Sequence, residues 1–242
     1  MSAPNFDRST YDRLLSRGLP SGLGDTEHAC IMACLNLACG GTLTDAAESP
    51  CVLPAAARFA IRLNDADWSS EMARADGLKD LGLALLGTND LDRKVFLLRL
   101  AEATIREVVP VFMRRAGLAD EAKRCADEGT REAALAGKEK ARKKRDAAAD
   151  AYAYAAASAA YDAYAYAAAY AASAYDAAAA AGAACAAAYD ASYAYADAGD
   201  AADAASGRAS TDAYRKKYGD ETLILSAKIA TRILTEMKAA TP

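Results

Sequence analysis

The chain has 242 residues, a formal net charge of −4 and a pI near 5.2. This weakly acidic balance gives no general electrostatic reason to bind nucleic acid or an anionic membrane surface, and we expect neither partner. The amino-terminal residues lack the apolar core of a signal peptide, so we expect a cytoplasmic protein. In that compartment the six cysteines are expected to be reduced thiols rather than disulfides.

Apolar residues recur at helical spacing through residues 1–118, and we predict a globular helical front domain there. The expected helices cover residues 6–17, 29–39, 54–63, 69–86 and 91–115. Asp25 or Thr26 is the predicted cap of the helix over 29–39, and Ser69 or Ser70 of the helix that follows Trp68. We find no convincing strand, so the predicted fold class is all-α.

Two further segments flank the centre of the chain. Residues 119–145 are highly charged and predict one long polar helix that acts as a connector. The basic run 138–145 could contact phosphates, but such runs are common on solvated helices, and we expect no nucleic acid. Residues 208–242 predict a C-terminal docking helix, whose apolar stripe needs the front domain to bury it.

The most unusual segment is the Ala/Tyr-rich region, residues 146–207, in which 36 of the 60 residues from 146 to 205 are Ala. Ala has the highest helix propensity, so we predict helices. Gly182 and Gly199 favour breaks, and hence a hairpin or bundle. The dipeptide Tyr-Asp recurs at a spacing of two heptads, which aligns one stripe of tyrosines and one of aspartates. The residues of these stripes are Tyr154, Tyr161, Tyr175, Tyr189, Asp162, Asp176 and Asp190.

This region allows several interpretations. It could be a low-complexity helical expansion that contributes only packing, or a surface through which copies of the chain associate. A membrane span is disfavoured, because the longest uncharged runs, 163–175 and 177–189, are shorter than the ~18 residues needed. Ice binding is disfavoured because no Thr lies between 146 and 210.

Candidate reactive or ligand-binding residues gather in the front domain at His28, Cys30, Asp45 and Cys51. A cysteine near a histidine could act as a nucleophile, and a helix N-terminus could lower the pKa of Cys30. Zinc would use Cys30, Cys34 and His28, but the usual pair of closely spaced Cys knuckles is missing and buried Cys often serves as a small hydrophobe. We therefore predict no catalytic residue, no metal and no cofactor.

Several short elements within residues 18–115 resemble a group of uncharacterised phage and bacterial proteins that often carry low-complexity segments behind this block. These elements are Gly22-Leu-Gly24, Cys30-Ile31, Asp45, Pro50-Cys51-Val52, Arg62-Leu63-Asn64-Asp65, Trp68-Ser69-Ser70 and Leu85-Leu86-Gly87. The resemblance implies a phage-linked setting and no established activity. Met32 and Thr44 stand where the group commonly has Glu and His, so chemistry carried by those residues in relatives would be absent here.

A weaker resemblance links the Arg-Leu-Ala-Glu segment, residues 99–102, and the Ala-rich region behind it to immunity proteins of bacterial toxin systems. Together these observations favour a non-enzymatic interaction or self-assembly protein that forms a homo-oligomer or binds a protein partner. The alternatives are a small-ligand or thiol-dependent enzyme centred on Cys30 and Cys51, and a neutraliser of a toxin or defence factor.

Overall fold

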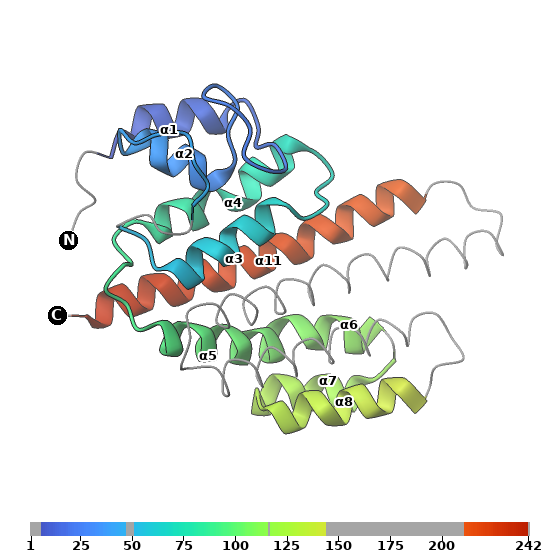
Figure 1. The fold of residues 1–242 in the computed structure, drawn as a ribbon. Helices are drawn as coiled ribbons and strands as arrows, with labels where there is room; N and C mark the ends of the chain where they lie inside the picture. Colours follow the sequence, from blue (N-terminus) through green and yellow to red (C-terminus); the bar gives the residue numbers. More distant parts are fainter. Residues whose placement is uncertain (1–5, 47–50, 116, 144–210, 242) are drawn as a thin grey trace. The chain divides into compact units, whose positions relative to one another are not determined.

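The structure is a computed structural model that describes residues 6–46, 51–115, 117–143 and 211–241. It confirms the predicted all-α class: most of the described residues are helical, and their β-type pairing is confined to an isolated bridge between Gly24 and Ala29 (Figure 1). The elements are α1 (Arg8–Leu15), α2 (Ile31–Ala38), α3 (Pro54–Asn64), α4 (Glu71–Leu85), α5 (Arg93–Ala103), η1 (Thr104–Val108), α6 (Val109–Arg115), α7 (Ala119–Glu128), α8 (Arg131–Lys143) and α11 (Thr211–Ala240).

The chain divides into two compact units. The first unit contains residues 1–96 and 227–242, and the second contains residues 97–226. The division falls inside α5 and inside α11, so each of these helices contributes to both units.

Helix starts in the first unit follow from local capping. The Asp7 side chain accepts a hydrogen bond from the Ser9 amide at the start of α1, and Ser70 accepts one from the Ala73 amide at the start of α4. These bonds satisfy amides that have no partner within the helix. The prediction that Asp25 or Thr26 caps α2 is wrong. The N-cap is Cys30, whose Sγ accepts from the Ala33 amide, because the chain from Asp25 to Ala29 forms a tight turn before the helix begins.

The core of the first unit depends on a close approach between α1 and α4. Tyr11 is fully buried, and its hydroxyl donates a hydrogen bond to the Lys79 carbonyl at 2.8 Å. A Cβ atom at Gly82 would lie 2.1 Å from that hydroxyl oxygen. Only glycine at this position of α4 leaves room for the tyrosine ring, so one small residue sets the distance between the two helices.

Buried hydrogen bonds fix the connections around α3 and α4. The Trp68 indole donates to the Leu63 carbonyl at 2.8 Å, which closes the turn between the two helices. Thr88 is fully buried just after α4, and its hydroxyl donates to the Leu85 carbonyl and accepts from the Leu53 amide. The Thr88 amide donates to the Cys51 carbonyl at 3.1 Å. The end of α4 is therefore tied to the start of α3.

Residues 227–240 of α11 belong to the first unit, where the apolar stripe of this helix is expected to dock. Six of these residues are buried: Ala227, Ile229, Ala230, Ile233, Leu234 and Met237. Lys238 Nζ donates to the carbonyls of Ala84 and Leu86 at the C-terminal end of α4, at 3.0 and 3.3 Å. A cation at this end of a helix complements the partial negative charge of its free carbonyls.

The second unit departs from the predicted continuous helix over 91–115, because a π-helical turn, η1, separates α5 from α6. Pro110 lies two residues beyond η1. Proline has no amide hydrogen and its ring collides with the carbonyl four residues earlier, which is that of Arg106. A widened turn relieves this collision while the chain stays helical.

The charged segment 119–145 is also not one helix as predicted. It forms α7 and α8, because Gly129 adopts a left-handed conformation at the end of α7 and the Thr130 hydroxyl accepts from the Ala133 amide at the start of α8. The two helices contribute buried residues to the core of this unit. That core comprises Ile105, Val109, Met113, Leu118, Ala122, Cys125, Ala133 and Ala134.

Arg106, which lies within η1, closes the C-terminal end of α7. Its guanidinium donates to the carbonyls of Ala126, Asp127 and Glu128, and its Nε contacts Glu102 at 2.9 Å. One side chain thus satisfies three carbonyls that have no partner within their helix.

The Ala/Tyr-rich region lies outside the described residues, and so do the predicted stripes of tyrosines and aspartates. Within the described part of the chain, no helix is both long enough and apolar enough to cross a bilayer.

We expect Arg106→Ala to lower the free energy of unfolding of the full chain by about 2 kcal/mol, because three helix-terminal carbonyls lose a charged donor. Arg124→Ala is the matched control, since it removes an exposed pair with Glu128 within α7 and is expected to cost less than about 0.5 kcal/mol. Urea unfolding followed by circular dichroism measures both. Equal losses for the two variants would contradict the role given to Arg106.

Candidate functional site

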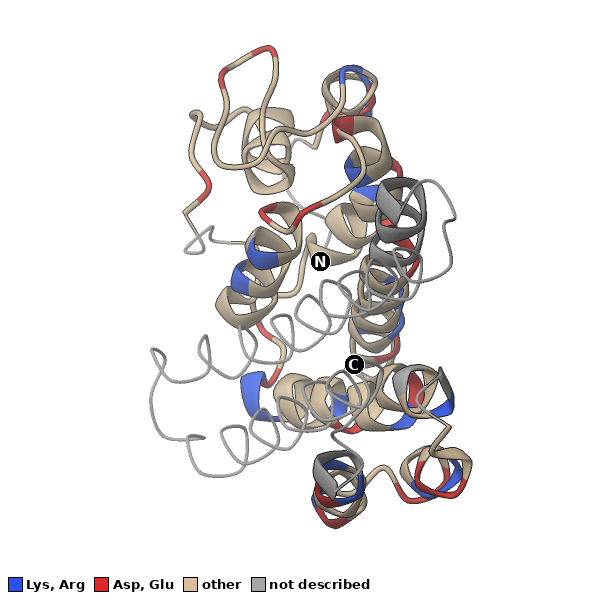
Figure 2. Ribbon diagram, turned by 90° about the vertical axis from the view of Figure 1, so that its right-hand side faces the viewer, with Lys and Arg blue, Asp and Glu red and all other residues tan. Residues whose placement is uncertain are grey.

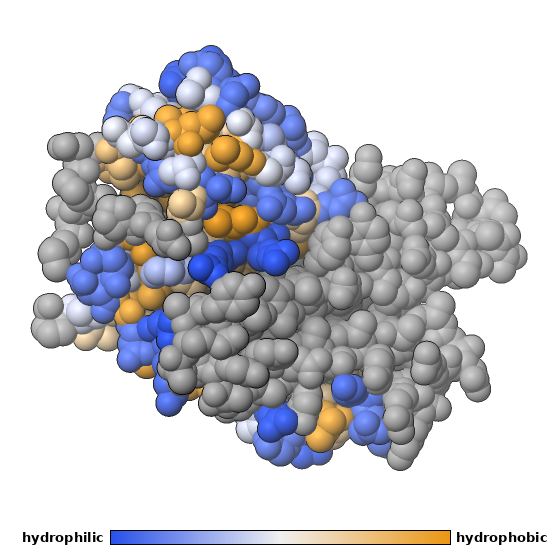
Figure 3. All heavy atoms as spheres, in the orientation of Figure 1, coloured by the Kyte–Doolittle hydropathy of each residue, from blue (hydrophilic) through white to orange (hydrophobic). Residues whose placement is uncertain are grey.

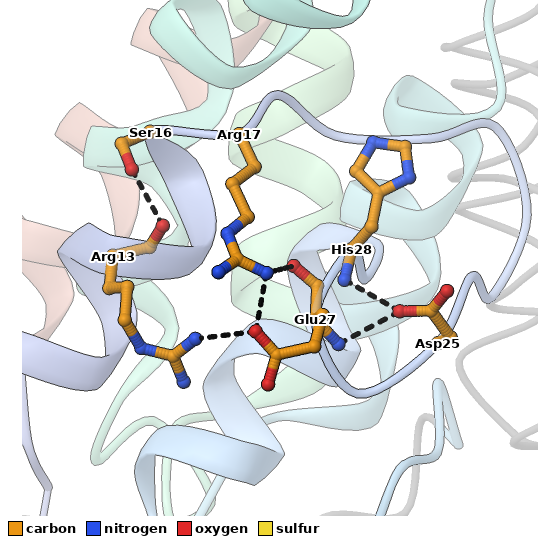
Figure 4. A network of polar contacts seen from close by, with 6 residues as sticks. All are labelled: Arg13, Ser16, Arg17, Asp25, Glu27 and His28. Atoms are coloured by element: carbon orange, nitrogen blue, oxygen red, sulfur yellow. Dashed lines mark hydrogen bonds and ion pairs between the residues drawn. The ribbon is translucent and has the colours of Figure 1, made fainter.

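The richest polar arrangement among the described residues surrounds the irregular segment 18–30, which joins α1 to α2. Asp25 Oδ1 accepts hydrogen bonds from the backbone amides of Glu27 and His28, each at 2.8 Å (Figure 4). The Asp25 amide donates to the His28 carbonyl at 2.8 Å, which closes the same turn. The hydrogen bond from the Glu27 amide is the largest of the effects that lower the pKa of Asp25 below its ordinary value. The carboxylate therefore organises a turn.

Glycine is required next to this turn. Gly24 has a φ of +75°, and a Cβ atom there would lie 2.0 Å from the His28 carbonyl oxygen. Any other residue would push the two sides of the turn apart.

An exposed ion-pair cluster links this turn to α1. The Glu27 carboxylate accepts from Arg13 at 3.0 Å and also from Arg17, and Arg17 donates to the Glu27 carbonyl at 3.1 Å (Figure 4). The side chains of all three are about half exposed, so solvent screens the pairs. The two guanidinium groups share one carboxylate, and the nearby Asp25 carboxylate balances the second positive charge.

His28, a candidate reactive or ligand-binding residue, contacts the start of α4. Its imidazole points away from Asp25 and Glu27 in Figure 4, and its Nε2 lies 3.2 Å from Glu71 Oε2 at the start of α4. The Leu19 amide donates to the Glu71 backbone carbonyl, so the same residue of α4 holds both ends of the segment. The only histidine of the chain is therefore placed against a carboxylate and a helix start.

Beneath the surface cluster, Asn64 anchors the segment from the end of α3. Asn64 is 1 % exposed; its Nδ2 donates to the Pro20 carbonyl at 2.8 Å and its Oδ1 accepts from the Ile31 amide at 3.2 Å. The neighbouring Asp65 accepts from the Gly22 amide at 2.9 Å. Two adjacent side chains thus satisfy backbone groups at two positions of this irregular loop and at the first residue of α2.

Arg74 of α4 completes this anchor. It is 6 % exposed, and its guanidinium donates to the carbonyls of Leu19 and Ala66. Burying a guanidinium is costly unless it is hydrogen bonded. The bonds to Leu19 and Ala66 therefore tie α4 to the loop and to the turn between α3 and α4.

Cys30 is poorly suited to act as a nucleophile. The thiol is 3 % exposed, and burial raises its pKa above the ordinary value. Asp45 and Asp65 add negative charge nearby, which raises the pKa further. The bonds from the amides of Ala33 and Met32 act in the opposite direction, as expected at a helix N-terminus, but they are outweighed by burial.

Cys34 is more deeply placed than Cys30. It is fully buried, its Sγ donates to the Ala29 carbonyl at 3.2 Å, and burial raises its pKa to about 12. Among the described residues, no three His, Cys, Asp or Glu side chains are grouped so that they could hold a metal ion. Cys30 and Cys34 are electrostatic neighbours, whereas His28 pairs with Glu71.

Cys51 lies near Cys39. Cys51 is close enough to affect the pKa of Cys39, and both residues are partly exposed. Burial, followed by the effect of Cys51, raises the pKa of Cys39. No pattern in the sequence indicates that Cys39 and Cys51 lie near each other.

The four candidate residues of the sequence analysis therefore take part in three separate arrangements. His28 pairs with Glu71, Cys30 has Asp45 nearby, and Cys51 lies near Cys39. Sequence reasoning missed the polar anchor of Asn64, Asp65 and Arg74. The available sequence signal for such an anchor is the Asn-Asp pair that ends the motif Arg62-Leu63-Asn64-Asp65, at the end of a predicted helix.

The views in Figures 2 and 3 show how charged and hydrophobic residues are distributed among the described residues. Basic and acidic residues are interspersed along the helices (Figure 2), and the hydrophobic groups visible in Figure 3 are small and separated by hydrophilic ones. A hollow of about 270 Å³ between α7 and α8 is lined by both signs of charge, including Asp120, Arg124 and Lys140.

Comparisons with known proteins give no relative: no protein-family model matches the chain, and neither a curated protein nor a solved structure is significantly similar to it.

We expect Asn64→Ala to lower the free energy of unfolding by about 2 to 3 kcal/mol, because the Pro20 carbonyl and the Ile31 amide lose their buried partner. Asn89→Ala is the control, since Asn89 is exposed and bonds only a neighbouring carboxylate, that of Asp90. Urea unfolding compares the two. A loss below about 0.5 kcal/mol for Asn64→Ala would show that the anchor is dispensable.

Burial raises the pKa of Cys125 in the second unit to about 11, from an ordinary value of 9.0. The native state keeps this thiol neutral while the unfolded chain ionises, so its contribution to stability is complete below about pH 9 and is lost between about pH 9 and 11. Urea midpoints measured across this range should fall more steeply for the wild type than for Cys125→Ala. Parallel declines would contradict the raised pKa, because all other titrating groups are shared.

Proposed function

We propose that the protein is a non-enzymatic interaction protein that self-associates through its Ala/Tyr-rich region, residues 146–207. The observation that carries this proposal is the repeat of Tyr-Asp at positions 161, 175 and 189. A spacing of two heptads returns a residue to the same face of a helix, and heptad spacing is typical of helices that pack along their length.

The residue types of this region suit close helix packing. On a helix, Ala168 would lie on the tyrosine stripe midway between Tyr161 and Tyr175, and Ala179 would lie about 40° from it. Small side chains let helix backbones approach toward the short end of the 8–10 Å range. Tyrosines above and below supply apolar area and a hydroxyl that needs a partner. Asp162, Asp176 and Asp190 follow about 100° further round and would keep that side hydrated.

The described helices before and after the region support the proposal because each of them contributes buried residues to a core. α8 precedes it and contributes Ala133 and Ala134 to the core of the second unit. α11 follows it, and from Ala227 onward its apolar residues are buried in the first unit. The described residues form buried cores in both units. Residues 146–207 could therefore use part of their surface for association.

The alternative functions gain less from the geometry. A thiol-dependent enzyme needs an accessible thiolate and a base, whereas Cys30 is buried and His28 pairs with Glu71. A neutraliser of a toxin or defence factor needs an exposed acidic or aromatic patch, and both signs of charge occur along the helices drawn in Figure 2.

Sedimentation velocity on single-residue variants tests the proposal. Ala179→Leu places extra volume near the tyrosine stripe and is expected to weaken self-association at least about tenfold, as overpacking by about 1 to 3 kcal/mol implies. Ala177→Leu is the matched control, because position 177 lies about 200° from Tyr175 on a helix and faces away from the stripe.

Circular dichroism of each variant first establishes that helix content is unchanged. A wild-type chain that stays monomeric at high concentration would refute the proposal. Equal association of the wild type, Ala179→Leu and Ala177→Leu would refute the assigned packing face.

A further inference from the structure

We draw no further inference here: the strongest candidate, the hollow between α7 and α8, is lined by a cluster of acidic and basic side chains on the surface of the two helices, and no second observation among the described residues points to a ligand that would fill it.

Discussion

The first unit depends on the satisfaction of backbone groups in a loop that has little regular structure. Segment 18–30 connects α1 to α2. Its backbone carbonyls and amides lose their hydrogen bonds to water on folding, so they need partners from α3 and α4. Asn64, Asp65 and Arg74 supply them, with Asn64 alone bonding both the Pro20 carbonyl and the Ile31 amide. Because Ile31 begins α2, the position of that helix follows from the anchor.

This constraint gives a structural meaning to the motifs on which the sequence resemblance rests. Asn64 and Asp65 of the Arg-Leu-Asn-Asp element hold the loop, and Trp68 and Ser70 of the Trp-Ser-Ser element close the next turn and cap α4. Gly24 permits the turn at His28. These residues fix the fold of the first unit, and chemistry at this site is not needed to account for them. The resemblance itself stays an expectation.

Much of the helical architecture could be predicted from the sequence, because apolar periodicity and the glycines between helices are local signals. The predictions fail at helix starts and breaks, where packing decides which of several local signals is used. Cys30 rather than Asp25 caps α2, Pro110 follows a π-helical turn, and Gly129 divides α7 from α8. The candidate site was less predictable. The contact from His28 to Glu71 and the nearness of Cys39 to Cys51 join residues 43 and 12 positions apart, and composition holds no record of which groups meet.

We propose that the Ala/Tyr-rich region, which lies between the packed helices α8 and α11, associates with copies of itself. Native mass spectrometry of the full-length wild type, purified without chelator, tests this most directly, because one spectrum reports the number of subunits and any retained metal or metabolite. The account predicts a symmetric oligomer whose mass equals a whole number of chains of 25.2 kDa each. A monomer that carries zinc or a bound metabolite would contradict it and would move the function to the cysteine-containing region of the first unit.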